Sequence, residues 1–401
     1  MITRSSMLRV VIMSLVVLAA ACSDSSKPSS TASSTASLSP AEAAKAYQDP
    51  GPSPVGVTTL TLQKGNKVEV WYPAVAGTTG TETYDVRDFT PEGIKALLTA
   101  NVPATFSYPA GRDANVADGS FPLVFFSHGF SGIRVGSSHL TSHLASWGMI
   151  VAAPDHPSRD LPHALTFQNG NAHDAVDDVN ATLTRMKAEN TKPGGLFNGH
   201  VDEQRVAIVG HSAGGGTAEA AAREIDPIRG YVSLASGSFG GGGGSGGSNA
   251  STTSTTVPPP VDKPSLFVAG ANDNVAVVDR VTNPAFHRAV PPTRLWVIDK
   301  TGHNAFDDFC TLGNGAGIIG VAEASGLGPL LSSPTFSQFK TLGEDGCKPP
   351  DLPVQQVWPI IDHVVTSWLR NLFGIDPQPI GLGPAVANQY VVPVRIEERL
   401  Q

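Results

Sequence analysis

Short apolar runs recur along the chain, and between them apolar residues recur at helical spacing. Residues 55–62 and 67–71 alternate in the manner of two paired strands. Largely apolar runs then follow at 123–127, 149–154, 205–210, 230–235, 265–269 and 295–298. Helical spacing is found over 137–147, 172–187, 213–223 and 357–373. Buried strands that alternate with helices are typical of a mostly parallel sheet covered on both faces. The pattern predicts an α/β domain over residues 46–376, built on a mostly parallel eight-stranded sheet.

Several stretches lack the composition of a packed core. Residues 23–45 are rich in Ser, Thr, Ala and Pro, which predicts a disordered tether. The Gly/Ser/Thr/Pro run 237–260 predicts a disordered insertion. Residues 311–348 are rich in Gly, Ala, Leu and Ser. Both insertions leave the sheet at the end where ligands bind, so each can rim a pocket or serve as a passive loop. Residues 377–401 are interpreted as a C-terminal tail.

The N-terminus has the pattern of an export signal. Arg4 and Arg9 come before about 11 apolar residues, a run too short to span a bilayer. Three alanines then precede Cys22, so residues 1–21 resemble a lipoprotein signal peptide, although Leu18 lies one position further from the cysteine than usual. We expect an exported protein, which contacts a membrane only through lipid on Cys22. The alternative is an ordinary cleavage site at the same bond and a secreted protein.

The cysteines indicate the cellular compartment of the protein, and the charge excludes one class of binding partner. The chain has three cysteines. If Cys22 carries lipid, Cys310 and Cys347 remain to form a disulfide in an oxidising compartment, and two unpaired thiols are the alternative. The formal net charge is −8, and the 27 basic residues form no dense run. This argues against nucleic acid as a partner, because binding phosphates requires a basic patch.

Residues 210–214 read Gly-His-Ser-Ala-Gly, the pattern of a nucleophile elbow. Such an elbow is a sharp turn from strand to helix that holds a serine above the sheet, and its glycines remove side chains that would collide. Here the motif follows the apolar run 206–209 and opens the predicted helix 213–223. We therefore predict Ser212 as a nucleophile; a purely structural glycine-rich turn is the alternative.

A serine nucleophile requires a base, and the base requires a carboxylate that orients it. Among 11 histidines, His303 follows the last strand of the predicted sheet, from where it can reach over the elbow. Asp273 follows the strand 265–269, which produces the order Ser-Asp-His along the chain. We predict His303 as the base and Asp273 as the acid. The rival acids, which also suit a capping role, are Asp155, Asp307 and Asp308.

The turn His128-Gly129-Phe130 ends the strand 123–127. We predict that the backbone N–H groups of Phe130 and Ala213 form an oxyanion hole, with a tight turn of no catalytic role as the alternative. Side chains that follow strands on the same edge are candidates to line the substrate pocket: His128, Phe130, His156 and His211.

Five segments together resemble a known family over residues 55–373. They read Val-Trp-Tyr-Pro at 70–73, Ser-His-Gly-Phe-Ser at 127–131, Ala-Pro-Asp-His-Pro at 153–157, the elbow, and Gly-His-Asn-Ala-Phe at 302–306. The chain resembles the branch of the α/β-hydrolase fold that holds platelet-activating-factor acetylhydrolase-like, chlorophyllase-like and dienelactone-hydrolase-like enzymes and polyester cutinases. The resemblance implies hydrolysis of a small-molecule ester or lipid, without a metal or an organic cofactor.

Three functions are open at this point. The first is a serine hydrolase of the esterase, lipase or acetylhydrolase kind that acts through an acyl-enzyme. The second is an exported lipoprotein that binds an apolar ligand on an inactive hydrolase scaffold. The third is a thioesterase or peptidase with the same triad. An inactive scaffold usually lacks one member of the triad, and none is missing here, so ester hydrolysis is our hypothesis.

Overall fold

A computed structural model of the protein describes residues 38–237 and 258–401. The expected signal peptide 1–21, Cys22, most of the tether 23–45 and most of the insertion 237–260 lie outside the described residues. Within the two described ranges, every helix is too short or too polar to cross a membrane.

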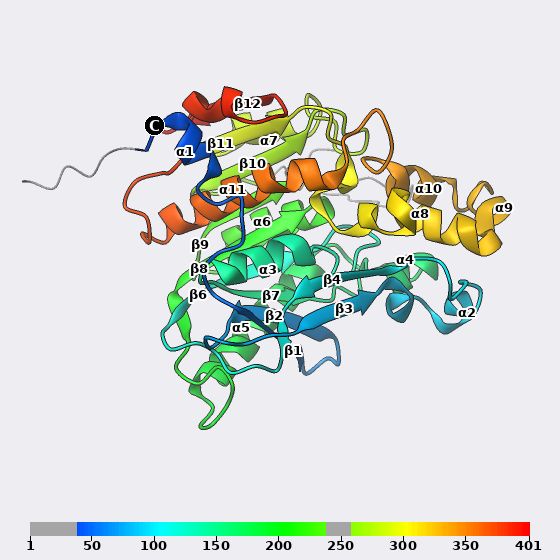
Figure 1. The fold of residues 1–401 in the computed structure, drawn as a ribbon, viewed down its shortest axis with the longest axis horizontal. Helices are drawn as coiled ribbons and strands as arrows, with labels where there is room; N and C mark the ends of the chain where they lie inside the picture. Colours follow the sequence, from blue (N-terminus) through cyan, green and yellow to red (C-terminus); the bar gives the residue numbers. More distant parts are fainter. Residues whose placement is uncertain (1–37, 238–257) are drawn as a thin grey trace, which may run out of the picture. The chain divides into compact units, whose positions relative to one another are not determined.

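One ten-stranded sheet forms the centre of the domain, in the order β12-β11-β10-β9-β8-β6-β7-β2-β1-β5 (Figure 1). The strands from β6 to β11 run parallel, whereas β2 and β12 are antiparallel to their neighbours β7 and β11. The mostly parallel sheet is confirmed, but it has ten strands and not eight. The strands are β1 (Val55–Thr61), β2 (Lys67–Pro73), β5 (Gly111–Arg112), β6 (Phe121–Ser127), β7 (Ile150–Pro154), β8 (Val201–His211), β9 (Ile228–Leu234), β10 (Ser265–Gly270), β11 (Thr293–Ile298) and β12 (Val394–Arg399).

The C-terminal segment 377–401 is part of the fold and not a tail. After the 3₁₀ helix η6 (Pro384–Gln389), β12 pairs with β11 along six residues of each strand. The sequence of β12 is Val-Arg-Ile-Glu-Glu-Arg, which has little apolar content, because an edge strand is stabilised by backbone hydrogen bonds and tolerates charged side chains. The β5 strand has only two residues, too few to leave a pattern.

The predicted tether ends before residue 45, because Pro40–Lys45 form helix α1. Ser39 and Glu42 make a capping box, in which each side chain accepts the backbone N–H of the other residue. Ala44 is fully buried against the core, and the Tyr47 hydroxyl donates to Asp376 at 2.5 Å. The spacing Ser-x-x-Glu at 39–42 predicts the start of a helix, but the Ser/Thr/Ala/Pro composition of the whole segment favoured a disordered tether.

Helices cover both faces of the sheet, because successive strand residues point to opposite sides. Val124 and Phe126 of β6 belong to one hydrophobic cluster together with α3 (Ser138–Ser146) and α11 (Val354–Leu372). Leu123 and Phe125 of the same strand belong to a second cluster. This second cluster includes residues of α5 (Asp174–Thr191), α6 (Ala213–Glu224) and α7 (Thr282–Arg288).

The remaining elements gather at one end of the sheet (Figure 1). A two-stranded ribbon of β3 (Thr81–Asp85) and β4 (Thr105–Pro109) stands apart from the main sheet. Residues 311–348 are largely helical and not irregular. The short helices are η1 (Val86–Phe89), α2 (Glu92–Lys95), α4 (Leu161–Leu165), η2 (His303–Phe306), η3 (Phe309–Thr311), η4 (Gly313–Gly315), α8 (Gly317–Ala322), the π-helix η5 (Glu323–Leu327), α9 (Gly328–Leu331) and α10 (Ser337–Glu344).

Candidate active site

The turn between β8 and α6 has the backbone of an elbow. Ser212 adopts φ 54° and ψ −124°, a backbone conformation that residues other than glycine rarely adopt. A Cβ atom on Gly210 would lie 2.0 Å from the Gly214 carbonyl oxygen, and one on Gly214 would lie 1.9 Å from the Ser127 oxygen. Both positions therefore exclude every larger residue, and the turn holds the Ser212 side chain at the end of β8.

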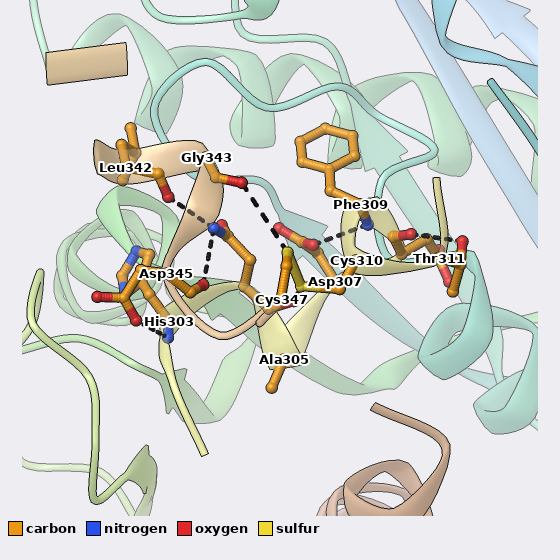
Figure 2. Close-up of a disulfide and its surroundings, with 12 residues drawn as sticks. His303, Ala305, Asp307, Phe309, Cys310, Thr311, Leu342, Gly343, Asp345 and Cys347 are labelled. Atoms are coloured by element: carbon orange, nitrogen blue, oxygen red, sulfur yellow. Dashed lines mark hydrogen bonds between the residues drawn. A yellow bond between two sulfur atoms is a disulfide. The ribbon is translucent and has the colours of Figure 1, made fainter. Parts of the chain in front are cut away.

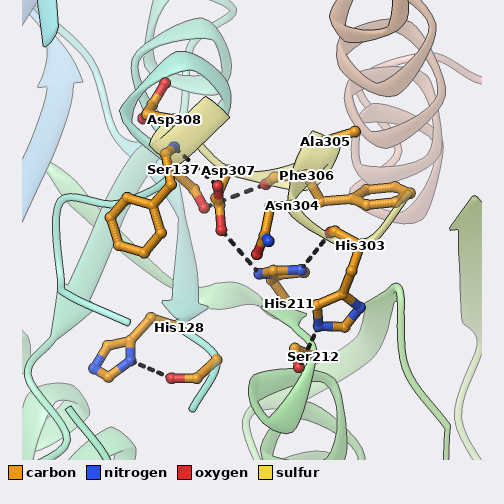
Figure 3. A network of polar contacts seen from close by, with 12 residues as sticks. His128, Ser137, His211, Ser212, His303, Asn304, Ala305, Phe306, Asp307 and Asp308 are labelled. Atoms are coloured by element: carbon orange, nitrogen blue, oxygen red, sulfur yellow. Dashed lines mark hydrogen bonds and ion pairs between the residues drawn. The ribbon is translucent and has the colours of Figure 1, made fainter. Parts of the chain in front are cut away.

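Three side chains that are distant in sequence meet at this turn. The His303 Nε2 atom lies 2.8 Å from Ser212 Oγ, and His303 Nδ1 lies 2.8 Å from Asp273 Oδ2. Figure 3 shows the imidazole of His303 above Ser212. The carboxylate can only accept, so in a neutral imidazole Nδ1 carries the hydrogen and Nε2 accepts from the serine hydroxyl. The exposed fractions of Ser212, Asp273 and His303 are 8%, 3% and 1%, so bulk water is largely excluded from the chain of hydrogen bonds.

The Asp273 carboxylate is itself held by backbone donors. Its Oδ1 atom accepts the N–H groups of Val275 at 2.8 Å and Ala276 at 2.6 Å, which leaves Oδ2 for His303. Hydrogen bonds to an ionised acceptor are among the stronger ones in proteins. The orientation of the carboxylate is thus set by the loop after β10 and does not depend on the histidine alone.

The turn 128–130 packs directly against Ser212. A Cβ atom on Gly129 would lie 3.0 Å from Ser212 Cβ, so glycine permits this close approach. In the described part of the chain, the N–H groups of Phe130 and Ala213 donate to no protein acceptor. Free backbone donors in the turn 128–130 and directly after Ser212 are available to stabilise an oxyanion.

A cavity of about 360 Å³ opens over Ser212, and we call it the catalytic pocket. His128, Phe130 and His211, the candidates for the substrate pocket, line it together with His303. Beside it lies a wider cleft that encloses about 1010 Å³ of space, part of it open to solvent, and we call it the apolar pocket.

Three comparisons relate the chain to known proteins. A family model for platelet-activating factor acetylhydrolase, isoform II, matches residues 45–193. Chlorophyllase-1, chloroplastic, from Citrus sinensis is 30% identical over 116 residues, which are 29% of this chain and 31% of the chlorophyllase. The structure of a ferulic acid esterase from Streptomyces cinnamoneus matches with a TM-score of 0.59 and 18% identity. That match covers 88% of this chain and 99% of the esterase.

The chain has the α/β-hydrolase fold. The sequence match spans less than a third of the chlorophyllase, whereas the structural match covers most of this chain and nearly all of the esterase. The predicted α/β-hydrolase fold is therefore confirmed.

The rival acids of this α/β-hydrolase have other partners. Asp155 pairs with Arg134 at 3.0 Å, and Asp308 accepts the Tyr108 hydroxyl. Asp307 accepts the Phe309 N–H at 2.9 Å, and burial raises the pKa of its carboxyl well above the usual range. Because Asp273 has the direct bond to His303, these three acids do not replace it in the structure.

His211 contacts the loop that carries His303 from the side. Its Nε2 atom lies 3.1 Å from the His303 carbonyl oxygen, and its Nδ1 atom lies 3.8 Å from Asp307 (Figure 3). Burial, followed by the nearby His303, lowers the pKa of His211 well below its usual value. His211 is therefore neutral near pH 7 and can donate Nε2–H to the His303 carbonyl.

The prediction for His156 is wrong: this side chain is fully buried and is not among the residues that line the catalytic pocket. Its Nε2 atom lies 2.9 Å from Ser127 Oγ, and its Nδ1 atom lies 3.2 Å from Asp178. The residue follows β7, which is next to β6 in the sheet, so its ring reaches the underside of the turn 128–130 instead of the open side. Burial lowers the pKa of His156 well below its usual value, which makes the ring neutral.

Arg159 is a buried residue of the site that sequence reasoning missed. Its guanidinium donates to the His128 carbonyl at 2.8 Å, to Ser127 Oγ at 2.8 Å and to Thr217 of α6 at 2.8 Å. Burial lowers its pKa to about 9, so it remains charged near pH 7. It ties the turn 128–130 to the helix that follows the nucleophile. An arginine after a strand is usually exposed, so no sequence signal marked it.

Asp345 is the second missed residue, and it connects the loops that carry His303 and Asp273 to the segment 311–348. Its Oδ1 atom accepts the His303 N–H at 2.7 Å, and Oδ2 accepts the Asn274 N–H at 3.0 Å. Its carbonyl accepts the Asn304 N–H at 2.9 Å. Cys310 and Cys347 form a disulfide, as predicted, so Asp345 lies two residues from a covalent link back to the histidine loop (Figure 2). Its proximity to Cys347 was the only sequence signal available.

Proposed function

We propose that this α/β-hydrolase cleaves carboxylic esters through an acyl-enzyme formed on Ser212. The observation that carries the proposal is the continuous hydrogen-bonded chain from Asp273 through His303 to Ser212, with both links at 2.8 Å. The names of two similar proteins, an acetylhydrolase and an esterase, support an ester as the bond that is cleaved. The proposal makes Asp273, His303 and Ser212 a catalytic triad.

In the first step, Ser212 Oγ attacks the carbonyl carbon of the ester while His303 Nε2 takes the hydroxyl proton. The Asp273 carboxylate accepts Nδ1–H and stabilises the imidazolium that forms. The N–H groups of Phe130 and Ala213 bind the negatively charged oxygen of the tetrahedral intermediate. A donor in this position is typically worth about 10²–10³ in rate. The bond to the alcohol oxygen then breaks, and His303 returns its proton to the leaving alcohol.

In the second step, water replaces the alcohol. His303 takes a proton from the water molecule as its oxygen attacks the acyl carbon, and the same two N–H groups bind the oxyanion. When the bond to Ser212 Oγ breaks, His303 gives the proton back to the serine, and the carboxylic acid leaves.

Short-chain nitrophenyl esters and a fluorophosphonate probe test the proposal. We expect the wild type to hydrolyse the esters and to be labelled, whereas Ser212→Ala loses labelling and about 10⁴–10⁶ in kcat. Ser107→Ala is the matched control, because Ser107 is exposed on β4, and it keeps both properties.

Several outcomes contradict the proposal. Equal labelling of Ser212→Ala and the wild type rejects the nucleophile. A wild type that hydrolyses matched thioesters or amides faster than esters assigns another bond to the same triad. A complete absence of turnover at high enzyme concentration favours a protein that only binds its ligand.

We also propose that the protein is exported and anchored by lipid on Cys22. The disulfide between Cys310 and Cys347 supports this, because such bonds persist in oxidising compartments. Mass spectrometry of the mature N-terminus tests the proposal: a lipid adduct on Cys22 is expected in the wild type and is lost in Cys22→Ser. An unmodified N-terminus at residue 22 in the wild type rejects the anchor.

A further inference from the structure

The apolar pocket has the lining of a hydrocarbon site. Of its 22 lining residues, 18 are hydrophobic and none carries a charge. Its polar lining is limited to Thr90, Ser131 and Asn304, with Gly343 as the remaining member. A cleft with this lining cannot satisfy the hydrogen bonds of a polar ligand. Such a surface favours an apolar ligand.

The apolar pocket lies directly beside the catalytic pocket, and the two share lining residues. Phe130, Asn304, Phe309 and Leu342 line both cavities. Phe130, whose N–H is one of the two proposed oxyanion donors, also lines the apolar pocket, and its ring lies 6.0 Å from the ring of Phe339. An ester carbonyl held at Ser212 consequently has one of its two substituents at the mouth of the apolar pocket.

Short helices outside the sheet build the pocket. Its lining comes from α2, α4, α8, α9 and α10, and the last three belong to the segment 311–348 that the disulfide closes. At the rim, Leu97 and Leu330 are 53% and 44% exposed, and Phe167, which packs against the lining residues Phe336 and Phe339, is 55% exposed. Large apolar side chains left in water beside a cavity are typical of a surface that a ligand covers.

We propose that the apolar pocket holds a hydrocarbon chain of the substrate, so the preferred ester carries a chain on the order of ten carbons and not an acetyl group. The inference rests on the ester hydrolysis proposed above. An acetyl ester with a small alcohol leaves the pocket empty. A longer hydrocarbon chain leaves water and packs against the apolar lining while the ester carbonyl remains at Ser212. The chain can belong to the acyl group or to the alcohol, and the experiment has an arm for each.

Two ester series test the inference on the purified protein: nitrophenyl esters from acetate to dodecanoate, and acetate esters of alcohols from ethanol to dodecanol. In one series we expect kcat/KM to rise about two- to fourfold for each methylene that enters the pocket. Ala322→Trp fills the pocket, since Ala322 lines it, and should lower the ratio of long-chain to acetyl kcat/KM at least tenfold in that series. Ala324→Trp is the matched control: Ala324 is exposed, does not line the pocket, and should leave the ratio unchanged.

The outcomes separate this inference from the proposed function. If the wild type cleaves acetyl esters through Ser212 but neither series shows a gain with chain length, the pocket assignment is wrong and the ester hydrolysis stands. An equal loss of the ratio in Ala324→Trp also rejects the assignment.

If no ester is cleaved, a binding measurement tests the apolar pocket. Sodium decanoate is titrated into Ser212→Ala in a calorimeter, with sodium acetate as the control. Decanoate binding with a negative heat-capacity change, weakened at least tenfold by adding Ala322→Trp, supports the pocket. No decanoate binding overturns it.

Discussion

Asp345→Ala should slow catalysis while leaving substrate binding nearly unchanged. The carboxylate accepts two backbone N–H groups, from His303 at 2.7 Å and from Asn274 at 3.0 Å. One of these residues is the predicted base, and the other follows the predicted acid Asp273. The substitution removes both acceptors, so the two catalytic loops lose the group that joins them.

The magnitude follows from what is lost and what remains. A hydrogen bond to a charged group contributes about 1.5–3 kcal/mol, and because Asp345 is half-buried, water replaces part of this. The Asp345 carbonyl still accepts the Asn304 N–H, and Asp273 still holds the ring of His303. A displacement of a catalytic group by about 1 Å costs about 10² in rate. We therefore expect kcat to fall about 10- to 100-fold, which is far less than for Ser212→Ala.

The assay compares kcat, KM and unfolding in urea for three variants. KM should stay near the wild-type value, because Asp345 lines neither pocket. Asp345→Asn keeps one carbonyl oxygen and should recover part of kcat. Glu344→Ala is the control, since Glu344 pairs with Lys348 at 2.8 Å and makes no hydrogen bond to the histidine loop. A kcat of Asp345→Ala within twofold of the wild type, or an equal loss in Glu344→Ala, would refute the reasoning.

Two further predictions concern stability. The disulfide joins residues separated by 37 positions, so Cys347→Ser should lower the free energy of unfolding by about 4 kcal/mol. Urea unfolding measures this loss, and an unchanged midpoint would contradict it. Burial lowers the pKa of His363 to about 4, below its usual 6.5. Between these two pH values the imidazole is protonated in the unfolded chain but neutral in the folded protein, so acid favours unfolding. Lowering the pH from 7 to 5 should therefore cost about 2 kcal/mol more in the wild type than in His363→Gln, and equal losses in urea unfolding at both pH values would disprove the assignment.

The central sheet and the order of the site residues could be predicted from sequence because their signals are local. A buried parallel strand has to be apolar along its whole length, so the runs at 205–210 and 265–269 identify β8 and β10 without knowledge of their neighbours. The elbow is equally local, since the backbone at Ser212 permits only glycine two residues before and two after it. Parallel strands end at one edge, so residues that follow them meet there whatever the connecting segments do.

Features that depend on distant partners escaped prediction. The charged edge strand β12 is stabilised by its hydrogen bonds to β11, and its own composition resembles a loop. Residues 311–348 look like flexible chain, yet they fold into the wall of the apolar pocket and are closed by the disulfide.

Single side chains show the same difference between features with a local sequence signal and features that depend on distant contacts. His156 was expected in the pocket and lies beneath it, because the position of a ring depends on the strand beside it and not on the motif around it. Arg159 and Asp345 are ordinary surface types in composition, and only the folded chain surrounds them with the backbone groups of the site. The sequence by itself determined which residues can perform the chemistry, since that depends on local backbone and residue type. The tertiary structure alone decided what holds those residues in place and what cavity they face, because both result from contacts between segments far apart in the chain.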